Sequence, residues 1–275
     1  MSMNSFHARQ GGRPRDEKPA KSPVDRGGLQ RADALLVQLG LATSRTQAQK
    51  LIAAGRVFAD GAPIAKPSLE LLPEVTLTVS SDDSDRYVSR GGLKLAGALE
   101  KTGVDVRDSV CLDVGQSTGG FSDCLLQAGA HHVVGVDVGH GQLHPRLKND
   151  PRITMREGIN CRALCAADLG DAMPAGGFDL IVGDVSFISM SLILPQLPAL
   201  LAADGQLVLL IKPQFEVGPG NIGKGGIVRD TTLYRELELR FLDLARTLGL
   251  TAKGWFDSPI TGGDGNREFF IWLSK

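Results

Sequence analysis

The stretch that decides the fold is Cys-Leu-Asp-Val-Gly-Gln-Ser-Thr-Gly-Gly-Phe, residues 111–121. It joins an apolar strand ending near Asp113 to a glycine-rich turn and then to a helix, as at the carboxyl edge of the first strand of an open α/β sheet. The glycines let the backbone pass close to a ligand. The turn lacks the full spacing of dinucleotide-binding folds and the Lys-Ser/Thr ending of a phosphate-binding loop. It therefore predicts a different nucleoside cofactor, with a purely structural turn as the alternative.

A second strand ending in an acid narrows the choice of cofactor. Residues 133–137, Val-Val-Gly-Val-Asp, end in Asp137 where a ribose diol would lie. Together the two segments predict S-adenosylmethionine. Asn160, close behind the third expected strand, is a candidate hydrogen-bonding partner of the adenine, and a helix cap is the alternative.

Strands and helices alternate over the rest of the second half of the chain, which predicts a doubly wound, Rossmann-like, mostly parallel sheet with helices on both faces. The expected strands are residues 110–114, 132–137, 153–156, 178–183, 206–211 and 267–273. A helix is expected over residues 231–248, where leucine and phenylalanine recur at helical spacing.

The first part of the chain predicts a smaller α+β unit over residues 29–80. Two short helices are expected within residues 29–53, and Ser44 with Gln47 forms a capping box for the second. Asp60-Gly61 predicts a hairpin turn, and residues 75–79 complete a small sheet. Residues 1–28 are expected to be a disordered basic tail, residues 81–89 a linker, and residues 90–275 the larger domain.

Composition limits the classes of function. The chain has 275 residues and a net charge of −1, so bulk charge gives no support for nucleic-acid binding, although residues 1–31 carry seven Lys and Arg against three Asp and Glu. Its four cysteines have neither zinc-site nor disulfide spacing, which predicts reduced thiols, a cytoplasmic protein and no metal. No apolar run is long enough to span a membrane and no signal peptide is recognisable, so no membrane partner is expected.

Four charged residues are candidates for catalysis. Lys94 lies in the helix that enters the larger domain and Glu268 at the start of the last strand, whereas topology brings Asp184 and Lys212 to the carboxyl ends of the fourth and fifth strands. A buried lysine near a second ammonium can lose its proton and then take one from an alcohol, while carboxylates hold the amines in place. A pair of structural salt bridges is the alternative.

The segment after the fourth strand bears on the acceptor. It reads Asp-Val-Ser-Phe, residues 184–187, and lacks the paired prolines that grip exocyclic amines of bases. No cysteine follows the fourth or fifth strand to attack carbon 5 of a pyrimidine. An oxygen acceptor is therefore favoured, and a ribose 2′-hydroxyl fits an RNA-binding module. The glycine-rich loop 218–229, with Lys224 and Arg229, could hold an RNA phosphate; a mobile lid is the alternative.

These motifs carry a family likeness. The first unit resembles the RNA-binding domain first seen in small-subunit ribosomal protein four (the S4 domain), on Arg31-Ala-Asp-Ala-Leu-Leu-Val, Ser44-Arg45-x-x-Ala48 and Ile52-x-x-Gly55-x-Val57. The second resembles the FtsJ-type ribose methyltransferases, on residues 87–95, 113–121, 184–187, 212–216 and 223–230. Both units in this order resemble the TlyA, or haemolysin A, family of ribosomal RNA methyltransferases.

The resemblance implies 2′-O-methylation of cytidine in ribosomal RNA or ribosomal subunits, with S-adenosylmethionine as donor. Its catalytic tetrad would fall on Lys94, Asp184, Lys212 and Glu268, and its cofactor contacts on Asp113, Gly115, Ser117, Gly119 and Asp137. RNA phosphates are expected at Arg31, Arg45, Lys50 and Arg56. Gln116 replaces a small residue of the family and is expected to alter the rim of the cofactor pocket.

Two other functions remain open at this stage. One is an RNA-binding ribosome-assembly factor that no longer catalyses, against which the intact tetrad argues. The other, suggested only by the haemolysin name, is a membrane-damaging protein, against which the lack of a span or a strongly amphipathic basic helix argues. The sequence leaves the modified subunit and the oligomeric state open.

Overall fold

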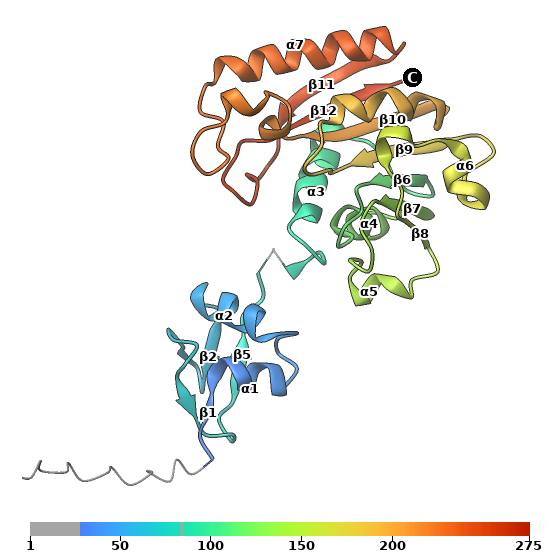
Figure 1. Ribbon diagram of the computed structural model, residues 1–275. Coiled ribbons are helices and arrows are strands. Elements are labelled where there is room, and N and C mark those ends of the chain that lie inside the picture. Colours follow the sequence, from blue (N-terminus) through green and yellow to red (C-terminus); the bar gives the residue numbers. More distant parts are fainter. Residues whose placement is uncertain (1–27, 83–84) are drawn as a thin grey trace, which may run out of the picture. The chain divides into compact units, whose positions relative to one another are not determined.

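The chain folds into two compact units, one up to Ser81 and one from Asp82 onward. A computed structural model describes residues 28–82 and 85–275 (Figure 1). The expected disordered tail, residues 1–28, therefore lies outside the described residues except for Gly28.

The smaller unit packs two helices on short antiparallel strands. Its elements are β1 (Gln30–Arg31), α1 (Ala32–Gln38), α2 (Arg45–Ala53), β2 (Val57–Ala59), β3 (Ala62–Pro63), β4 (Glu70–Leu71) and β5 (Leu77–Val79). The strands form one sheet of order β3-β2-β5 and a separate β1-β4 pair. Asp60 and Gly61 both have positive φ, +47° and +83°, so they form the expected hairpin turn. A core that includes Leu35, Leu36 and Ile52 holds helices and sheet together.

The N-terminus of α2 is capped, but only half of the expected capping box forms. The Ser44 hydroxyl accepts a hydrogen bond from the Gln47 backbone N–H at 3.2 Å. The Gln47 side chain accepts instead from the backbone N–H of Thr43 at 2.6 Å and from its hydroxyl at 2.7 Å. The reciprocal bond to Ser44 is thus replaced by one to the preceding residue.

The larger unit is built on a seven-stranded sheet of order β11-β12-β10-β9-β6-β7-β8. Its strands are β6 (Val110–Val114), β7 (His132–Asp137), β8 (Ile153–Glu157), β9 (Phe178–Gly183), β10 (Leu201–Ile211), β11 (Thr251–Asp257) and β12 (Phe269–Ser274). Strands β6 to β10 run parallel, and β12 pairs antiparallel with both β10 and β11. The chain crosses from one side of the central β6 to the other between β8 and β9, which creates the switch point of a doubly wound sheet.

Alternate residues of the strands face two separate apolar layers, which explains the near-continuous apolar strand sequences. Leu112 and Val114 of β6 face the layer formed with α7 (Thr232–Thr247), whereas Cys111 faces the layer formed with α3 (Gly91–Thr102) and α4 (Gly120–Gln127). The short helices α5 (Pro145–Lys148) and α6 (Ala166–Leu169) pack on opposite faces. Figure 1 shows α7 lying along β11 and β12.

The structure differs from the sequence expectation in three places. Strand β11 was not expected, and β10 begins at Leu201, five residues earlier than expected. The second half of the expected linker belongs to the larger unit. Tyr87 is buried there, and the Val88 N–H donates to the Asp123 carboxylate at 2.8 Å.

Candidate active site

The candidate site lies at the carboxyl ends of β6, β7 and β9, where the chain leaves each strand toward the switch point. Gly115 follows β6 with a φ of +84°, and its N–H donates to the Val136 carbonyl at 2.9 Å. A Cβ on Gly115 would lie 2.8 Å from the carbonyl oxygen of Asp184. Only glycine fits here, because both the backbone angle and the neighbouring strand end exclude a side chain.

A larger cavity of about 530 Å³ opens beside this turn. Four of the six expected cofactor-binding residues line it: Gly115, Ser117, Asp137 and Asn160. The two oxygens of Asp137 accept hydrogen bonds from the N–H groups of Ser117 at 2.8 Å and Gly139 at 2.7 Å, which fixes the carboxylate at the cavity wall. Asn160 also caps a short 3₁₀ turn by accepting from the Arg162 N–H at 3.1 Å, so its two proposed roles are compatible.

The other two expected cofactor residues do not line either cavity. Asp113 is fully buried and accepts a hydrogen bond from the Ser122 hydroxyl at 2.7 Å. Burial raises the pKa of Asp113 to about 7. Gly119 has a φ of +90°, and a Cβ there would lie 2.5 Å from Leu147 and 2.7 Å from Leu143. Both residues therefore support the conformation of the turn from its buried side and do not form part of the wall of either cavity.

Gln116 is also turned inward, contrary to the expectation that it alters the rim of the cofactor pocket. Its side chain is buried and donates to the Ser122 hydroxyl at 2.8 Å. It covers Gly135, where a Cβ would lie 2.0 Å from the Gln116 amide carbon. The residue borders the smaller cavity described next and does not line the larger one.

Three of the four expected catalytic residues line a smaller cavity of about 240 Å³: Lys94, Asp184 and Lys212. The Lys212 ammonium lies 2.5 Å from the Asp184 carboxylate and donates to the Ser186 hydroxyl at 2.9 Å. The Lys94 ammonium donates to Glu268 at 2.6 Å, and these two side chains are only 10% and 2% exposed. The structure thus forms two lysine–carboxylate pairs from residues far apart in the sequence.

The two cavities share part of their walls. Both are lined by Gly115, Ser117, Asp184 and Ser186. A molecule in the larger cavity and a molecule in the smaller cavity would therefore meet beside Asp184 and Ser186. Lys212 stands at this boundary through its contacts with both residues. The sequence analysis did not single out Ser186 as a site residue.

Phe187 is a second site residue that sequence reasoning missed. It lines the larger cavity, is 93% exposed and has a φ of +64°, an unusual angle for a bulky side chain. Its ring lies 5.6 Å from that of Phe215, measured between centroids. An exposed aromatic ring at a cavity can stack on a base. The motif 184–187 contains this residue, but only the structure shows its exposure.

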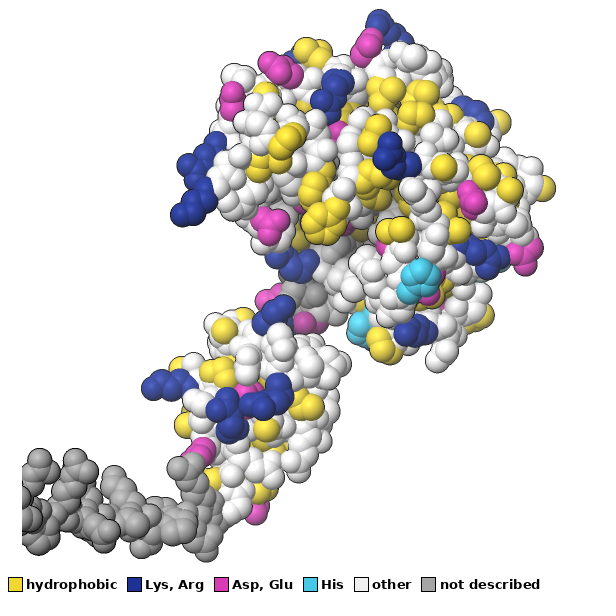
Figure 2. Space-filling model, in the orientation of Figure 1, with side chains coloured by type: hydrophobic (Ala, Val, Ile, Leu, Met, Phe, Trp, Pro, Cys, Tyr) yellow, Lys and Arg dark blue, Asp and Glu magenta, His cyan; other side chains and the backbone are white. Residues whose placement is uncertain are grey.

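Two of the four expected RNA-binding residues of the smaller unit, Arg31 and Arg45, are arranged around one buried acid, Asp33. Arg31 donates to the Asp33 carboxylate at 2.9 and 3.0 Å, Arg45 donates to it at 3.1 Å and Gln49 at 2.9 Å. The hydrogen bond from Arg31 is the main reason that the pKa of Asp33 lies well below its usual range. Lys and Arg side chains gather on the face of this unit seen in Figure 2. Lys50 is exposed on α2, whereas Arg56 donates to the Ser80 carbonyl at 2.6 and 3.1 Å.

The glycine-rich loop after β10 carries the other two expected RNA contacts, Lys224 and Arg229, both exposed. The buried Asn266 fixes this loop, because its side chain donates to the Gly226 carbonyl at 2.9 Å and accepts from the Val228 N–H at 3.0 Å. The loop is therefore anchored beside the segment that leads to Glu268.

Three of the four cysteines, Cys111, Cys124 and Cys161, are buried, and Cys165 is exposed. Burial raises the pKa of Cys111 and Cys124 to about 12 and that of Cys161 to about 11, so these thiols are poor nucleophiles. Among residues 28–82 and 85–275, no cluster of His, Cys, Asp and Glu could hold a metal ion. Within the same residues, no helix has the length and apolar character to cross a membrane.

Comparison with known proteins identifies both units. Residues 87–275 match the FtsJ-like methyltransferase model, and residues 30–77 match the S4 domain model. The chain is 46% identical over 243 residues to the 16S/23S rRNA (cytidine-2′-O)-methyltransferase TlyA of Mycobacterium tuberculosis, covering 88% of this chain and 89% of that protein. It is 37% identical over 239 residues to Hemolysin A of Brachyspira hyodysenteriae, covering 87% and 97%.

A solved structure from Streptococcus thermophilus, of a protein given the name hemolysin, is similar over the whole described chain. It superposes with a TM-score of 0.69 at 40% sequence identity and covers 90% of this chain and 89% of that one. Both domain models, the sequence relatives and this structure agree with the division into two units. The chain therefore belongs to the TlyA family of methyltransferases, in which an S4 domain precedes an FtsJ-like methyltransferase domain.

Proposed function

We propose that this protein transfers the methyl group of S-adenosylmethionine to the ribose 2′-hydroxyl of cytidine in ribosomal RNA. The observation that carries the proposal is the meeting of two cavities at a lysine–carboxylate pair. Lys212 and Asp184 lie 2.5 Å apart at the boundary that both cavities share. The activity named for the Mycobacterium tuberculosis relative supports the choice of cytidine as acceptor.

The larger cavity fits the methyl donor. Its volume of about 530 Å³ suits a nucleoside-sized ligand. The fixed Asp137 carboxylate would accept hydrogen bonds from the ribose diol, and the apolar Val138 and the amide of Asn160 would contact the adenine. The bound donor would supply an electrophilic methyl group on a sulfonium.

The acceptor ribose would enter the smaller cavity with its 2′-hydroxyl at Lys212. In the proposed step the hydroxyl oxygen would bond to the methyl carbon, the bond from that carbon to sulfur would break, and the hydroxyl proton would pass to Lys212 as the general base. Lys94 stabilises the negative charge that develops on the oxygen. Asp184 and Glu268 hold the two amines at 2.5 and 2.6 Å, so that both are aligned before the reaction.

RNA capture would use cations in both units. Arg31, Arg45, Lys50 and Arg56 of the smaller unit, and Lys224 and Arg229 of the glycine-rich loop, are the proposed phosphate contacts. Arg31 and Arg45 are well suited because Asp33 already orients both guanidinium groups. Such contacts would place the RNA without reading its sequence. A ribosomal substrate also places the protein in the cytoplasm.

The test is transfer of a labelled methyl group to purified 30S and 50S subunits and to free ribosomal RNA. Lys212→Ala is compared with wild type, and Lys253→Ala, which removes an exposed lysine of β11, is the matched control. Label that makes one phosphodiester resistant to alkaline cleavage, and that only Lys212→Ala loses, supports the proposal. Binding of S-adenosylmethionine without label on any substrate would instead support the non-catalytic assembly factor.

A further inference from the structure

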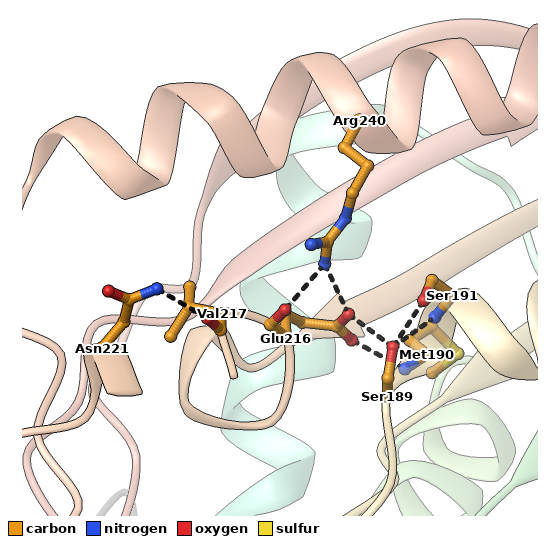
Figure 3. A network of polar contacts seen from close by, with 7 residues as sticks. All are labelled: Ser189, Met190, Ser191, Glu216, Val217, Asn221 and Arg240. Carbon is orange, nitrogen blue, oxygen red and sulfur yellow. Dashed lines mark hydrogen bonds and ion pairs between the residues drawn. The ribbon is translucent and has the colours of Figure 1, made fainter. Parts of the chain in front are cut away.

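A buried carboxylate outside the tetrad connects the two loops that carry the proposed reaction. Figure 3 shows Glu216 between the segment after β9 and helix α7. One oxygen of its side chain accepts from the Ser189 hydroxyl at 2.5 Å and from Arg240 at 3.0 Å. The other oxygen accepts from the Met190 N–H at 2.7 Å. Arg240 also donates to the Glu216 backbone carbonyl at 3.0 Å, so the guanidinium fixes both the side chain and the main chain.

The two connected loops each hold part of the catalytic pair. Asp184 lies five residues before Ser189, and Lys212 lies four residues before Glu216. Where the two loops leave the sheet, Lys212 and Asp184 join them through an ion pair of 2.5 Å. Four to five residues further along, the hydrogen bond between Ser189 and Glu216, also 2.5 Å, joins them again. The loops are therefore joined at both ends, and Ser186 and Phe187 lie on the stretch between.

Burying the Glu216 carboxylate costs a free energy of desolvation that an apolar contact at the same place would not cost. Burial raises the pKa of Glu216, because the carboxylate loses its contact with water. Its side chain is 1% exposed, and the bonds from Ser189, Met190 and Arg240 offset the loss. A buried ion pair is often no more stabilising than an apolar pair of the same size. Its directional bonds do, however, fix one relative position of the loops.

We infer that Glu216 is a positioning residue for methyl transfer. It fixes the segment after β9 against the segment after β10, which sets the spacing of Asp184 and Lys212 and the wall of the larger cavity formed by Ile188 and Ile193. Arg240, which lies on α7, contributes to this positioning through its ion pair with Glu216. This inference rests on the proposed function for the role of the Lys212–Asp184 pair.

The main test is Glu216→Gln, measured well below the unfolding midpoint and normalised to folded protein. The amide NH2 of Gln replaces one carboxylate oxygen and therefore faces either the Met190 N–H or the Ser189 hydroxyl and Arg240. At least one existing donor then loses its acceptor, which weakens the connection between the loops while the side chain keeps its size. We expect kcat to fall by about tenfold or more while KM for RNA changes by less than about twofold, because the proposed phosphate contacts lie elsewhere. Calorimetry should show weaker binding of S-adenosylhomocysteine, a readout that needs no methyl transfer.

Variants of Arg240 test whether the network acts as a unit. Arg240→Leu should lower kcat, Arg240→Lys should restore part of it, and Arg240→Leu combined with Glu216→Gln should be no worse than Glu216→Gln alone. Arg235→Leu is the matched control, since Arg235 is exposed on the same helix and pairs only with Glu238 among the ion pairs shown by the described residues. It should leave kcat and ligand binding unchanged.

The results separate this inference from the proposed function. Wild-type kcat and wild-type binding of S-adenosylhomocysteine in Glu216→Gln would overturn the inference, as would additive losses in the double variant. Loss of kcat in Arg235→Leu equal to that in Arg240→Leu would also overturn it, because general destabilisation of α7 would then explain the effect. No methyl transfer by wild-type protein to any ribosomal substrate would refute the proposed function instead, whatever Glu216→Gln does to the binding of S-adenosylhomocysteine.

Discussion

Replacing Asp113 with Asn should stabilise the protein relative to wild type increasingly as pH rises. Burial raises the pKa of the Asp113 carboxyl from 3.8 to about 7 in the folded protein. Between these two values the folded state binds more protons than the unfolded state, so wild-type stability falls as pH increases. Asp113 contributes its full stabilisation below its pKa in the unfolded state. That stabilisation is lost as the pH rises through its pKa in the folded state. An amide at position 113 does not titrate and is free of this loss.

The size of the effect follows from the shift. A change of about three pKa units corresponds to about 4 kcal/mol of free energy between pH 3.5 and pH 8. One buried oxygen of Asp113 accepts a hydrogen bond from the Ser122 hydroxyl at 2.7 Å, and the other oxygen has no hydrogen-bond partner among the described residues. Asn keeps an oxygen that can accept the hydrogen bond from the Ser122 hydroxyl, and its amide group replaces only the oxygen that has no partner among the described residues. The substitution should therefore cost little at low pH.

The assay is urea unfolding at several pH values, followed by tryptophan fluorescence. Both tryptophans of the chain, Trp255 and Trp272, belong to the larger unit that contains Asp113. Asp257→Asn is the control with the opposite sign, because the hydrogen bond from Arg267 lowers the pKa of Asp257 and its stabilisation appears as pH rises. A difference between Asp113→Asn and wild type that stays constant from pH 3.5 to pH 8 would refute the reasoning.

Three further substitutions test the site. Phe187→Ala should weaken binding of S-adenosylmethionine by about 1 to 3 kcal/mol, the cost of one stacked base, because the ring lines the larger cavity. The unfolding free energy should not change, because the ring is 93% exposed; calorimetry and urea unfolding measure the two. Gly119→Ala should destabilise the larger unit by about 2 to 4 kcal/mol in urea, because the new Cβ would lie 2.5 Å from Leu147 at a φ of +90°. Asp33→Asn should weaken RNA affinity by roughly 1 kcal/mol, since two arginines lose their orientation. Tighter binding by Asp33→Asn, as removal of a negative charge alone would give, contradicts that assignment.

The sequence predicted where the candidate catalytic residues lie better than it predicted their partners. Topology alone brings Asp184 and Lys212 to neighbouring strand ends, because β9 and β10 are parallel and adjacent. The pairing of Lys94 with Glu268 depends on how α3 packs against the antiparallel β12, and no local pattern contains that information. Ser186 was overlooked for the same reason, since its hydroxyl becomes part of the site only through the position of Lys212.

The cofactor motif illustrates a different limit. A glycine in such a turn can be required by a ligand or by packing, and the sequence does not distinguish the two. Gly119 packs against Leu143 and Leu147, although the motif suggested a cofactor contact. Strand β11 was missed because it begins Thr-Ala-Lys-Gly at the sheet edge, where residues need not be apolar, and its pairing with β12 shifts between Ala252 and Gly254.

Gly115 shows why the donor and acceptor sites cannot vary independently. The sequence assigned this glycine to the cofactor turn, yet its nearest neighbours are the Asp184 carbonyl oxygen and the Val185 side chain, each 2.8 Å from where a Cβ would lie. Any side chain at position 115 would therefore push on the segment that carries Asp184 and Ser186. That same segment is held from the other side by Glu216 through Ser189. The position of the Asp184 carboxylate, proposed to be catalytic, thus depends both on the absence of a side chain at Gly115 and on the buried Glu216 carboxylate beneath α7.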